Sequence, residues 1–188
     1  MLTMLFDYAC SFAQSKLPAL LIGTALFVLL RYVLCRAGAL SRGSIFHEVG
    51  LVLFALYLCA VLSLTFLPFR LDPAAGSYAF DSTLLAIVQG EYTAGNWVLA
   101  MMLGNILMLV PFGFLAPLLW ERLRGLRVLP VGLGLILAIE LLQPLTGRSF
   151  DVDDILLNFL GVLVGALLAL IFQALLPRQT AALRGPVN

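Results

Sequence analysis

Residues 155–176 read ILLNFLGVLVGALLALIFQALL, a run without a single charged side chain. A helix needs about 20 mostly apolar residues to cross the hydrocarbon core of a bilayer. Pro177 follows at once, and proline is typical of the point where a helix stops. This stretch therefore predicts a membrane-spanning helix, and it decides the class of fold.

Four more stretches have the same character, at residues 17–35, 50–67, 96–120 and 126–142. Arg31 interrupts the first of them. We expect its side chain to snorkel to the interface or to pair with Glu48, near the start of the next helix. The pattern predicts an all-α, polytopic transmembrane helical bundle of about five membrane helices, folded as a single transmembrane domain over residues 1–188.

The composition agrees with a membrane location. Hydrophobic residues make up 62% of the chain and charged residues 11%, whereas soluble domains are about half apolar and a quarter charged. A soluble fold of 188 residues could not bury so much apolar surface, so membrane lipids are the expected surroundings and partners. The net charge of +1 gives no indication of nucleic-acid binding.

The connection between the second and third predicted spans is polar and contains Gly and Pro. Within it, apolar side chains recur at helical spacing, at Phe80, Leu84, Leu85 and Val88. Asp81 or Ser82 would cap the amino terminus of such a helix. Because the segment is too short to span the bilayer, we predict a short interfacial helix near residues 80–90.

Basic residues are unevenly distributed between the two sides of the predicted bundle. The richer set of flanks holds Arg31, Arg36, Arg42, Arg122, Arg124, Arg127, Arg178 and Arg184, and the other set holds Lys16, Arg70 and Arg148. The positive-inside rule assigns the richer set to the cytoplasm. We therefore expect a multi-pass protein with its amino terminus outside and its carboxyl terminus in the cytoplasm.

Polar side chains occur near the predicted outer ends of four spans, where burial is costly unless a partner or a cavity is present. Glu140 and Gln143 are three residues apart, so they share a helix face. Asp154 and Asn158 are four apart and also share one. We predict an outward-facing polar pocket whose binding residues are Thr65, Asn105, Glu140, Gln143, Arg148, Asp151, Asp154 and Asn158.

A purely structural interpretation exists for most of these residues. Asn105 is of a type that often joins helices, and Thr65 is of a type that bonds back to its own helix. Asp154 would cap the last span, and Arg148 would neutralise a nearby carboxylate. Glu140 is harder to explain in this way, because alanine would be cheaper at a helix end that faces lipid.

A metal site is a further interpretation of the acidic run. Asp151, Asp153 and Asp154 form a D-x-D-D pattern, and aspartate oxygens of this kind bind Mg²⁺ or Ca²⁺. Short acidic runs in loops are more often simply solvated. The single histidine, His47, is expected on the opposite side, which excludes a His-based zinc site or a Ser-His-Asp triad here.

Two segments resemble the VanZ-like family, which is named for a teicoplanin-resistance protein. Residues 105–114, NILMLVPFGF, resemble its helix motif of an Asn followed by Pro-x-Gly. The segment from Glu140 to Gly165 resembles its most specific signature, with Gln143, Arg148, Asp151, Asp154, Asn158 and Gly161 at the matching positions. Thr65 before Pro68 is similar to an earlier Thr–Pro motif. The resemblance covers about residues 57–172, and Asp153 lies outside the family pattern.

The resemblance implies a small integral protein of the bacterial cytoplasmic (inner) membrane, with a link to teicoplanin tolerance and no established reaction. We expect the pocket to bind the head group of a cell-envelope lipid or lipid-linked cell-wall precursor, or a glycopeptide. One alternative is a metal-assisted enzyme on a lipid-linked substrate, with Glu140 and Asp154 as catalytic residues. Another is a structural partner in an envelope complex, with Gly161 and Gly165 at the interface. A transporter is less favoured, because the polar residues are confined to the outer half.

Overall fold

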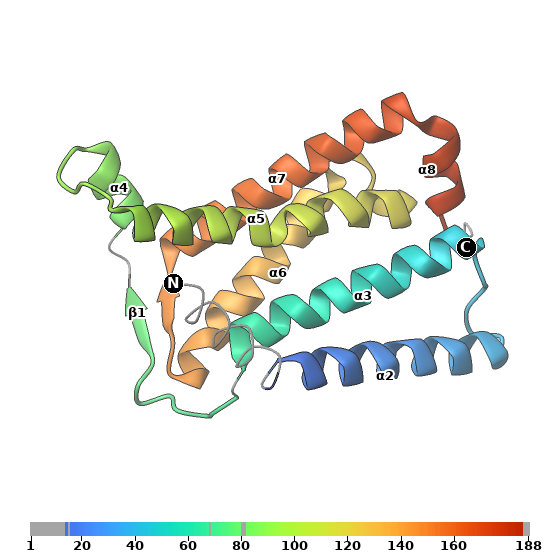
Figure 1. Cartoon of the computed structure of the whole chain (residues 1–188), viewed down its shortest axis with the longest axis horizontal. Helices are drawn as coiled ribbons and strands as arrows, with labels where there is room; N and C mark the ends of the chain where they lie inside the picture. Colours follow the sequence, from blue (N-terminus) through green and yellow to red (C-terminus); the bar gives the residue numbers. More distant parts are fainter. Residues whose placement is uncertain (1–13, 15, 68, 80–81, 186–188) are drawn as a thin grey trace. The chain divides into compact units, whose positions relative to one another are not determined.

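The computed structural model describes residues 14, 16–67, 69–79 and 82–185 (Figure 1). The described residues form two compact units, one that ends at Arg70 and includes Gly185, and one that comprises Leu71–Arg184. Pro68, Phe80 and Asp81, which the sequence interpretation used, lie outside the described residues. Each unit is built mainly from helices.

Five helices among the described residues are long and apolar enough to cross a membrane. They are α2 (Leu17–Arg36), α3 (Ile45–Phe66), α5 (Asn96–Leu119), α6 (Val128–Leu142) and α7 (Val152–Leu175). The 3₁₀ turns η2 (Gly125–Arg127) and η3 (Gln143–Thr146) extend α6 at both ends. The predicted all-α class and the five predicted spans are confirmed.

Two helix starts differ from the predicted boundaries because polar residues cap them. Helix α3 begins at Ile45 rather than near residue 50, since the Ser44 side chain accepts a hydrogen bond from the His47 backbone N–H. Helix α7 begins at Val152, since the Asp151 side chain accepts from the Asp153 N–H. Such caps satisfy N–H groups that have no partner inside the helix.

The first unit is a hairpin of α2 and α3, which lie side by side (Figure 1). Arg31 donates to both oxygens of Glu48, at 2.6 and 2.7 Å, so the predicted pairing is confirmed. At the other end of the hairpin, the Lys16 ammonium donates to the carbonyls of Ser63 and Leu67 at the end of α3. A cation is favourable there, because the helix dipole is negative at its carboxyl end.

In the second unit, α5 and α7 pack closely and run parallel. A side chain added at Gly161 would meet the Ile106 carbonyl, and one at Gly165 would meet that of Val110. Further along, the ring centres of Phe114 and Phe172 lie 5.6 Å apart. These contacts advance in the same direction along both helices. The absence of side chains at the two glycines therefore fixes how close the helices come and how they are registered.

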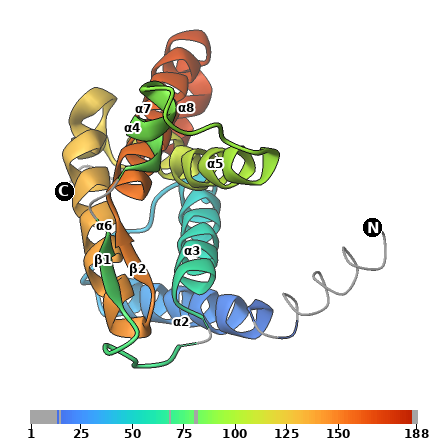
Figure 2. The ribbon, with the colours of Figure 1, turned by 90° about the vertical axis from the view of Figure 1, so that its left-hand side faces the viewer.

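Two three-residue strands join the loops at one end of this unit (Figure 2). Strand β1 (Ser77–Ala79) pairs in parallel with β2 (Ser149–Asp151), with Tyr78 opposite Phe150. The hydroxyl oxygens of Ser77 and Ser149 are 2.7 Å apart and share a hydrogen bond. The ring centres of Tyr78 and Phe150 are 5.9 Å apart. The segment that precedes α4 is thereby tied to the segment that joins α6 to α7.

Two shorter helices complete the second unit. Helix α4 (Thr83–Val88) confirms the predicted short helix, and Ser82 caps it by accepting from the Leu85 N–H at 3.0 Å. Helix α8 (Pro177–Leu183) follows α7. Near the far ends of α5 and α7, Glu121 forms salt bridges with Arg124 and Arg184. Arg124 and Arg184 thus lie at the opposite end of this unit from the loops that β1 and β2 join. An interfacial location for α4 stays a prediction.

Candidate functional site

Asn105 and Asp154 link the two parallel helices of the second unit. The side-chain amide of Asn105 on α5 donates to a carboxylate oxygen of Asp154 in the first turn of α7. Both side chains are half-buried. The glycine contacts of α7 with α5 hold the backbones close enough for this bond to form. The predicted convergence of these two polar residues is present in the structure.

Glu140 is the most deeply buried acidic side chain of the cluster, with 1% of its surface exposed. Its Oε2 accepts from the Asp151 backbone N–H at 3.4 Å, in the loop that leads into α7. Within the described part of the chain, no basic residue forms a salt bridge with it. A carboxylate in apolar surroundings is costly without an ionic partner, so its presence calls for an explanation.

Gln143 lies beside Glu140, as the three-residue spacing predicts, and it is also buried. Oriented to satisfy its neighbours, its amide nitrogen donates to Glu140 Oε2 at 3.0 Å and to the Ser149 carbonyl at 3.1 Å. The backbone carbonyl of Gln143 accepts from the backbone N–H of Arg148 at 3.2 Å. Gln143 therefore connects the buried carboxylate to the strand β2 and fixes the path of the loop.

Arg148 and Asp151 act through space on the carboxyl groups of Glu140 and Asp154. The Arg148 guanidinium attracts both Glu140 and Asp154, and the Asp151 carboxylate repels both. Glu140 and Asp154 also repel each other. Arg148 itself is exposed. Three carboxyl groups thus share the electrostatic influence of one guanidinium, which leaves an excess of acceptors and of negative charge.

Asn158 lies one turn after Asp154 on the same face of α7 and is 3% exposed. Its Oδ1 is buried and has no hydrogen-bond partner among the described residues. Buried side-chain oxygens are normally bonded, and an unbonded one costs free energy. The polar cluster therefore contains a buried acceptor that a donor group of a ligand would satisfy.

The three aspartates of the D-x-D-D run make three different sets of contacts. Asp151 caps α7, and Asp154 meets Asn105. Asp153 accepts from the Ser82 hydroxyl and, at 2.9 Å, from the Leu84 N–H at the start of α4. Within the described ranges, no group of three or more His, Cys, Asp or Glu side chains is placed to hold a metal ion. The arrangement gives no support to a metal site formed by Asp151, Asp153 and Asp154.

Asp153 is a structural residue that the sequence interpretation assigned only to the possible metal site. By receiving Ser82 and Leu84, it fixes α4 against the beginning of α7. A carboxylate near the amino terminus of a helix is also favoured by the free N–H groups and the dipole. The clue in the sequence was the Ser82 cap signal, but its distant partner has no local signature.

Thr65 belongs to the other unit, near the end of α3. Its hydroxyl donates to the Val61 carbonyl at 2.8 Å, one turn earlier in the same helix. This is the back-bonded structural role that Thr commonly takes in membrane helices. A binding role for Thr65 stays a prediction.

Gly161 and Gly165 have a packing role within the chain. The α5 backbone covers both positions, at Ile106 and Val110. This face of α7 is therefore occupied within the chain and is not available as an interface with a partner protein. The structural-partner hypothesis would need a different surface.

The arrangement as a whole offers hydrogen-bond acceptors in apolar surroundings. Glu140, Asp154 and the Asn158 Oδ1 would accept from hydroxyl, amide or ammonium groups, and the exposed Arg148 would donate to a phosphate or carboxylate. No match was found among curated proteins or among solved structures. The model of the VanZ/LLP1 family matches residues 54–173, a range that contains every predicted site residue. With well over half of its length matched, this chain belongs to the VanZ/LLP1 family.

Proposed function

We propose that this membrane protein binds the polar head group of a cell-envelope lipid or lipid-linked cell-wall precursor at the cluster around Glu140. The observation that supports this most strongly is the burial of Glu140, which is 1% exposed and has no salt bridge among the described residues. A carboxylate kept there despite its desolvation cost, with two neutral donors at Oε2, favours a ligand that supplies further donors.

The chemistry of the cluster favours a ligand with both donors and an anionic group. Glu140, Asp154 and the buried Asn158 Oδ1 are acceptors, so sugar hydroxyls, amides or ammonium groups suit them. Arg148, which is exposed, suits a phosphate because a guanidinium can bind two oxygens at once. Head groups of lipid-linked wall precursors combine these features. Under the predicted orientation, the cluster opens to the cell exterior.

The test is retention of lipid by the purified protein in nanodiscs that contain undecaprenyl-linked wall precursors. Mass spectrometry measures the precursor that remains bound to the wild type and to Asp154→Asn. We expect retention that drops several-fold in the variant, because an amide replaces one acceptor of the cluster and removes its charge. Equal retention by both proteins, or none by either, would refute the proposal. Glu91→Gln is the matched control, because Glu91 is an exposed acid outside the cluster.

The same sample addresses an enzymatic role, which the placement of Glu140 and Asp154 in one polar cluster supports. One of two interacting carboxyl groups can hold a proton while the other stays charged, as general acid–base catalysis requires. Incubation with and without divalent ions, followed over time, would then show conversion of the precursor in the wild type and not in Asp154→Asn. Retention without conversion identifies a binding protein.

Teicoplanin tolerance is the cellular consequence that we propose for this site. If the cluster binds or excludes the glycopeptide or its target, expression should raise tolerance in a susceptible bacterium, and Glu140→Ala and Asp154→Ala should abolish the increase. The control variant is Glu121→Ala, which removes a carboxylate at the far end of the same unit. If neither cluster variant changed tolerance, the result would show that this site has no role in teicoplanin tolerance.

A further inference from the structure

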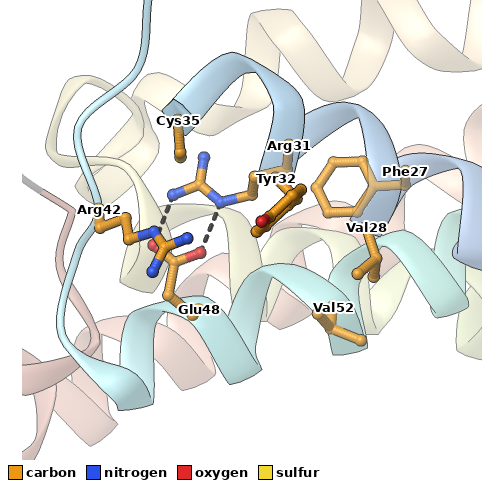
Figure 3. A pocket seen from close by; sticks show the side chains of 8 residues that line it. All are labelled: Phe27, Val28, Arg31, Tyr32, Cys35, Arg42, Glu48 and Val52. Atoms are coloured by element: carbon orange, nitrogen blue, oxygen red, sulfur yellow. Dashed lines mark hydrogen bonds and ion pairs between the residues drawn. The ribbon is translucent and has the colours of Figure 1, made fainter. Parts of the chain in front are cut away.

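A second site lies in the hairpin of α2 and α3. A cavity of about 240 Å³ opens between these helices, and its lining residues are Phe27, Val28, Arg31, Tyr32, Cys35, Arg42, Glu48 and Val52 (Figure 3). All of them precede residue 54, where the family match begins. The cavity belongs to the first unit, so it is separate from the cluster around Glu140.

The cavity has a charged end and an apolar end. Figure 3 shows Arg31, Arg42 and Glu48 gathered at one side and Phe27, Val28 and Val52 at the other. From Phe27 to the end of α2 at Arg36 the helix rises about 13 Å, at 1.5 Å per residue. The hydrocarbon core is about 30 Å thick. The cavity therefore extends from the end of the helix to a depth close to that of one leaflet.

The charged end carries an unbalanced guanidinium. Arg31 and Glu48 neutralise each other in a two-point ion pair whose side chains are 16% and 28% exposed. Arg42 lies over the Tyr32 ring at 5.9 Å from its centre. No carboxylate of the described residues forms a salt bridge with Arg42. The cavity thus has one positive charge more than its acids can balance.

Arg42 supplies the donors at this end of the cavity. The Arg31 Nε and Nη2 are bonded to Glu48, and Figure 3 shows the third Arg31 nitrogen on the side of the guanidinium away from Glu48. A guanidinium stacked on an aromatic face, as that of Arg42 is, still presents its N–H groups at its edge. The Arg42 guanidinium can therefore donate to the oxygens of a tetrahedral anion.

We propose that this cavity binds an anionic phospholipid. Its phosphate would lie at the edge of the Arg42 guanidinium, and one acyl chain would follow Phe27, Val28 and Val52 toward the bilayer centre. Charge complementarity selects an anion, and the apolar half selects one with a hydrocarbon chain. Basic pockets between transmembrane helices are suited to such head groups. The lipid would fill a gap between α2 and α3, and this role does not depend on the function proposed for the Glu140 cluster.

The test compares two lipids that differ in head-group charge. The full-length protein in detergent is titrated with dioleoylphosphatidylglycerol or dioleoylphosphatidylcholine, and bound lipid is counted by native mass spectrometry. The wild type should prefer the anionic lipid. Arg42→Ala should weaken binding of the anionic lipid about fivefold, since one basic group near a membrane surface contributes about 1 kcal/mol. Arg42→Lys should restore most of the preference, and Arg122→Ala, which removes an arginine from the other unit, should leave it unchanged.

The apolar half is tested by filling it. Val52→Trp should block the acyl chain and abolish tight binding, whereas Leu53→Trp should not, because Leu53 does not line the cavity and is 53% exposed. Undiminished preference in both Arg42→Ala and Val52→Trp would overturn the proposal. Competition by inorganic phosphate would identify a free anion as the occupant instead. A change of oligomeric state in Val52→Trp, with lipid binding intact, would identify a second copy of the chain as the occupant. Either the phosphate result or this one would overturn the proposal.

Discussion

The side-chain amide of Asn105 donates to the carboxylate of Asp154, which joins α5 to the first turn of α7. The bond crosses two helices whose backbones touch at Gly161 and Gly165. It has a structural consequence, since it satisfies two polar groups inside the bundle. It also has a functional one, because it orients the carboxylate that we place in the binding site.

The two roles of this pair are separable by mutation. Asn105→Leu alone should lower the melting temperature, because it leaves the Asp154 oxygen without its donor in apolar surroundings. The double variant Asn105→Leu with Asp154→Leu should recover much of that loss, because no polar group is then unpaired. Melting is measured by the fraction of protein that stays soluble in detergent after heating.

Precursor retention by the same two variants then isolates the role of Asp154. If the pair only joins the helices, the stable double variant retains as much precursor as the wild type. We expect it to retain several-fold less. A double variant that is stable and binds normally would remove Asp154 from the proposed site.

The glycines of α7 provide a test of the packing. Gly161→Ala should destabilise the protein by about 1–3 kcal/mol, because the added methyl group meets the Ile106 carbonyl and forces α5 away. Gly134→Ala on α6 is the control, since nothing lies within 4 Å of a side chain added there. Melting temperatures should fall for Gly161→Ala and be unchanged or higher for Gly134→Ala. Equal effects at the two positions would contradict the close approach of α5 and α7.

Asp153 should hold α4 in place. Asp153→Ala removes the acceptor of the Ser82 hydroxyl and of the Leu84 N–H, so amide hydrogen exchange should accelerate across residues 83–88. Asp153→Asn keeps one oxygen and should give an intermediate rate. Asp72→Ala is the control, because the Asp72 side chain accepts from the nearby Ala75 N–H at 3.3 Å and, among the described residues, makes no hydrogen bond with α4. Unchanged exchange in Asp153→Ala would show that α4 is held by other contacts.

The predicted orientation has a direct test in intact cells. In a background in which Cys10, Cys35 and Cys59 are replaced by serine, a membrane-impermeant maleimide should label Gln89→Cys from the outside. Arg122→Cys should be labelled only after the cells are opened. The prediction follows from the distribution of arginines under the positive-inside rule. The reverse labelling pattern would place the Glu140 cluster on the cytoplasmic side and exclude an extracellular ligand.

The helices were predictable because a long apolar run has few stable alternatives in a bilayer, where backbone groups must be bonded within the helix. The convergence of Asn105, Glu140 and Asp154 followed from their similar depth, combined with helical spacing. Helix α3 was predicted to start too late, because its first turn contains His47 and Glu48, which interrupt the apolar run. Polar residues of this kind can be assigned to the first turn of a helix only when the capping residue before them is recognised.

The pairing of Ser77–Ala79 with Ser149–Asp151 was not predictable. Strands of three residues show too little alternation to be recognised, and their partner is distant in sequence. For the same reason, Asp153 was interpreted from its neighbours Asp151 and Asp154, whereas its contacts come from Ser82 and Leu84. What could not be predicted is therefore the set of long-range contacts made by the loops.

The central claim, that the buried Glu140 carboxylate contributes to ligand binding, is tested most directly by one dissociation constant. The affinity of the nanodisc-embedded protein for an undecaprenyl-linked wall precursor is measured for wild type, Glu140→Gln and the control Glu121→Gln. Glutamine retains an oxygen for the Asp151 N–H and removes the charge. We predict binding about tenfold weaker in Glu140→Gln, the loss of one hydrogen bond to a charged group, with wild-type affinity in Glu121→Gln. Wild-type affinity in a correctly folded Glu140→Gln would contradict the account.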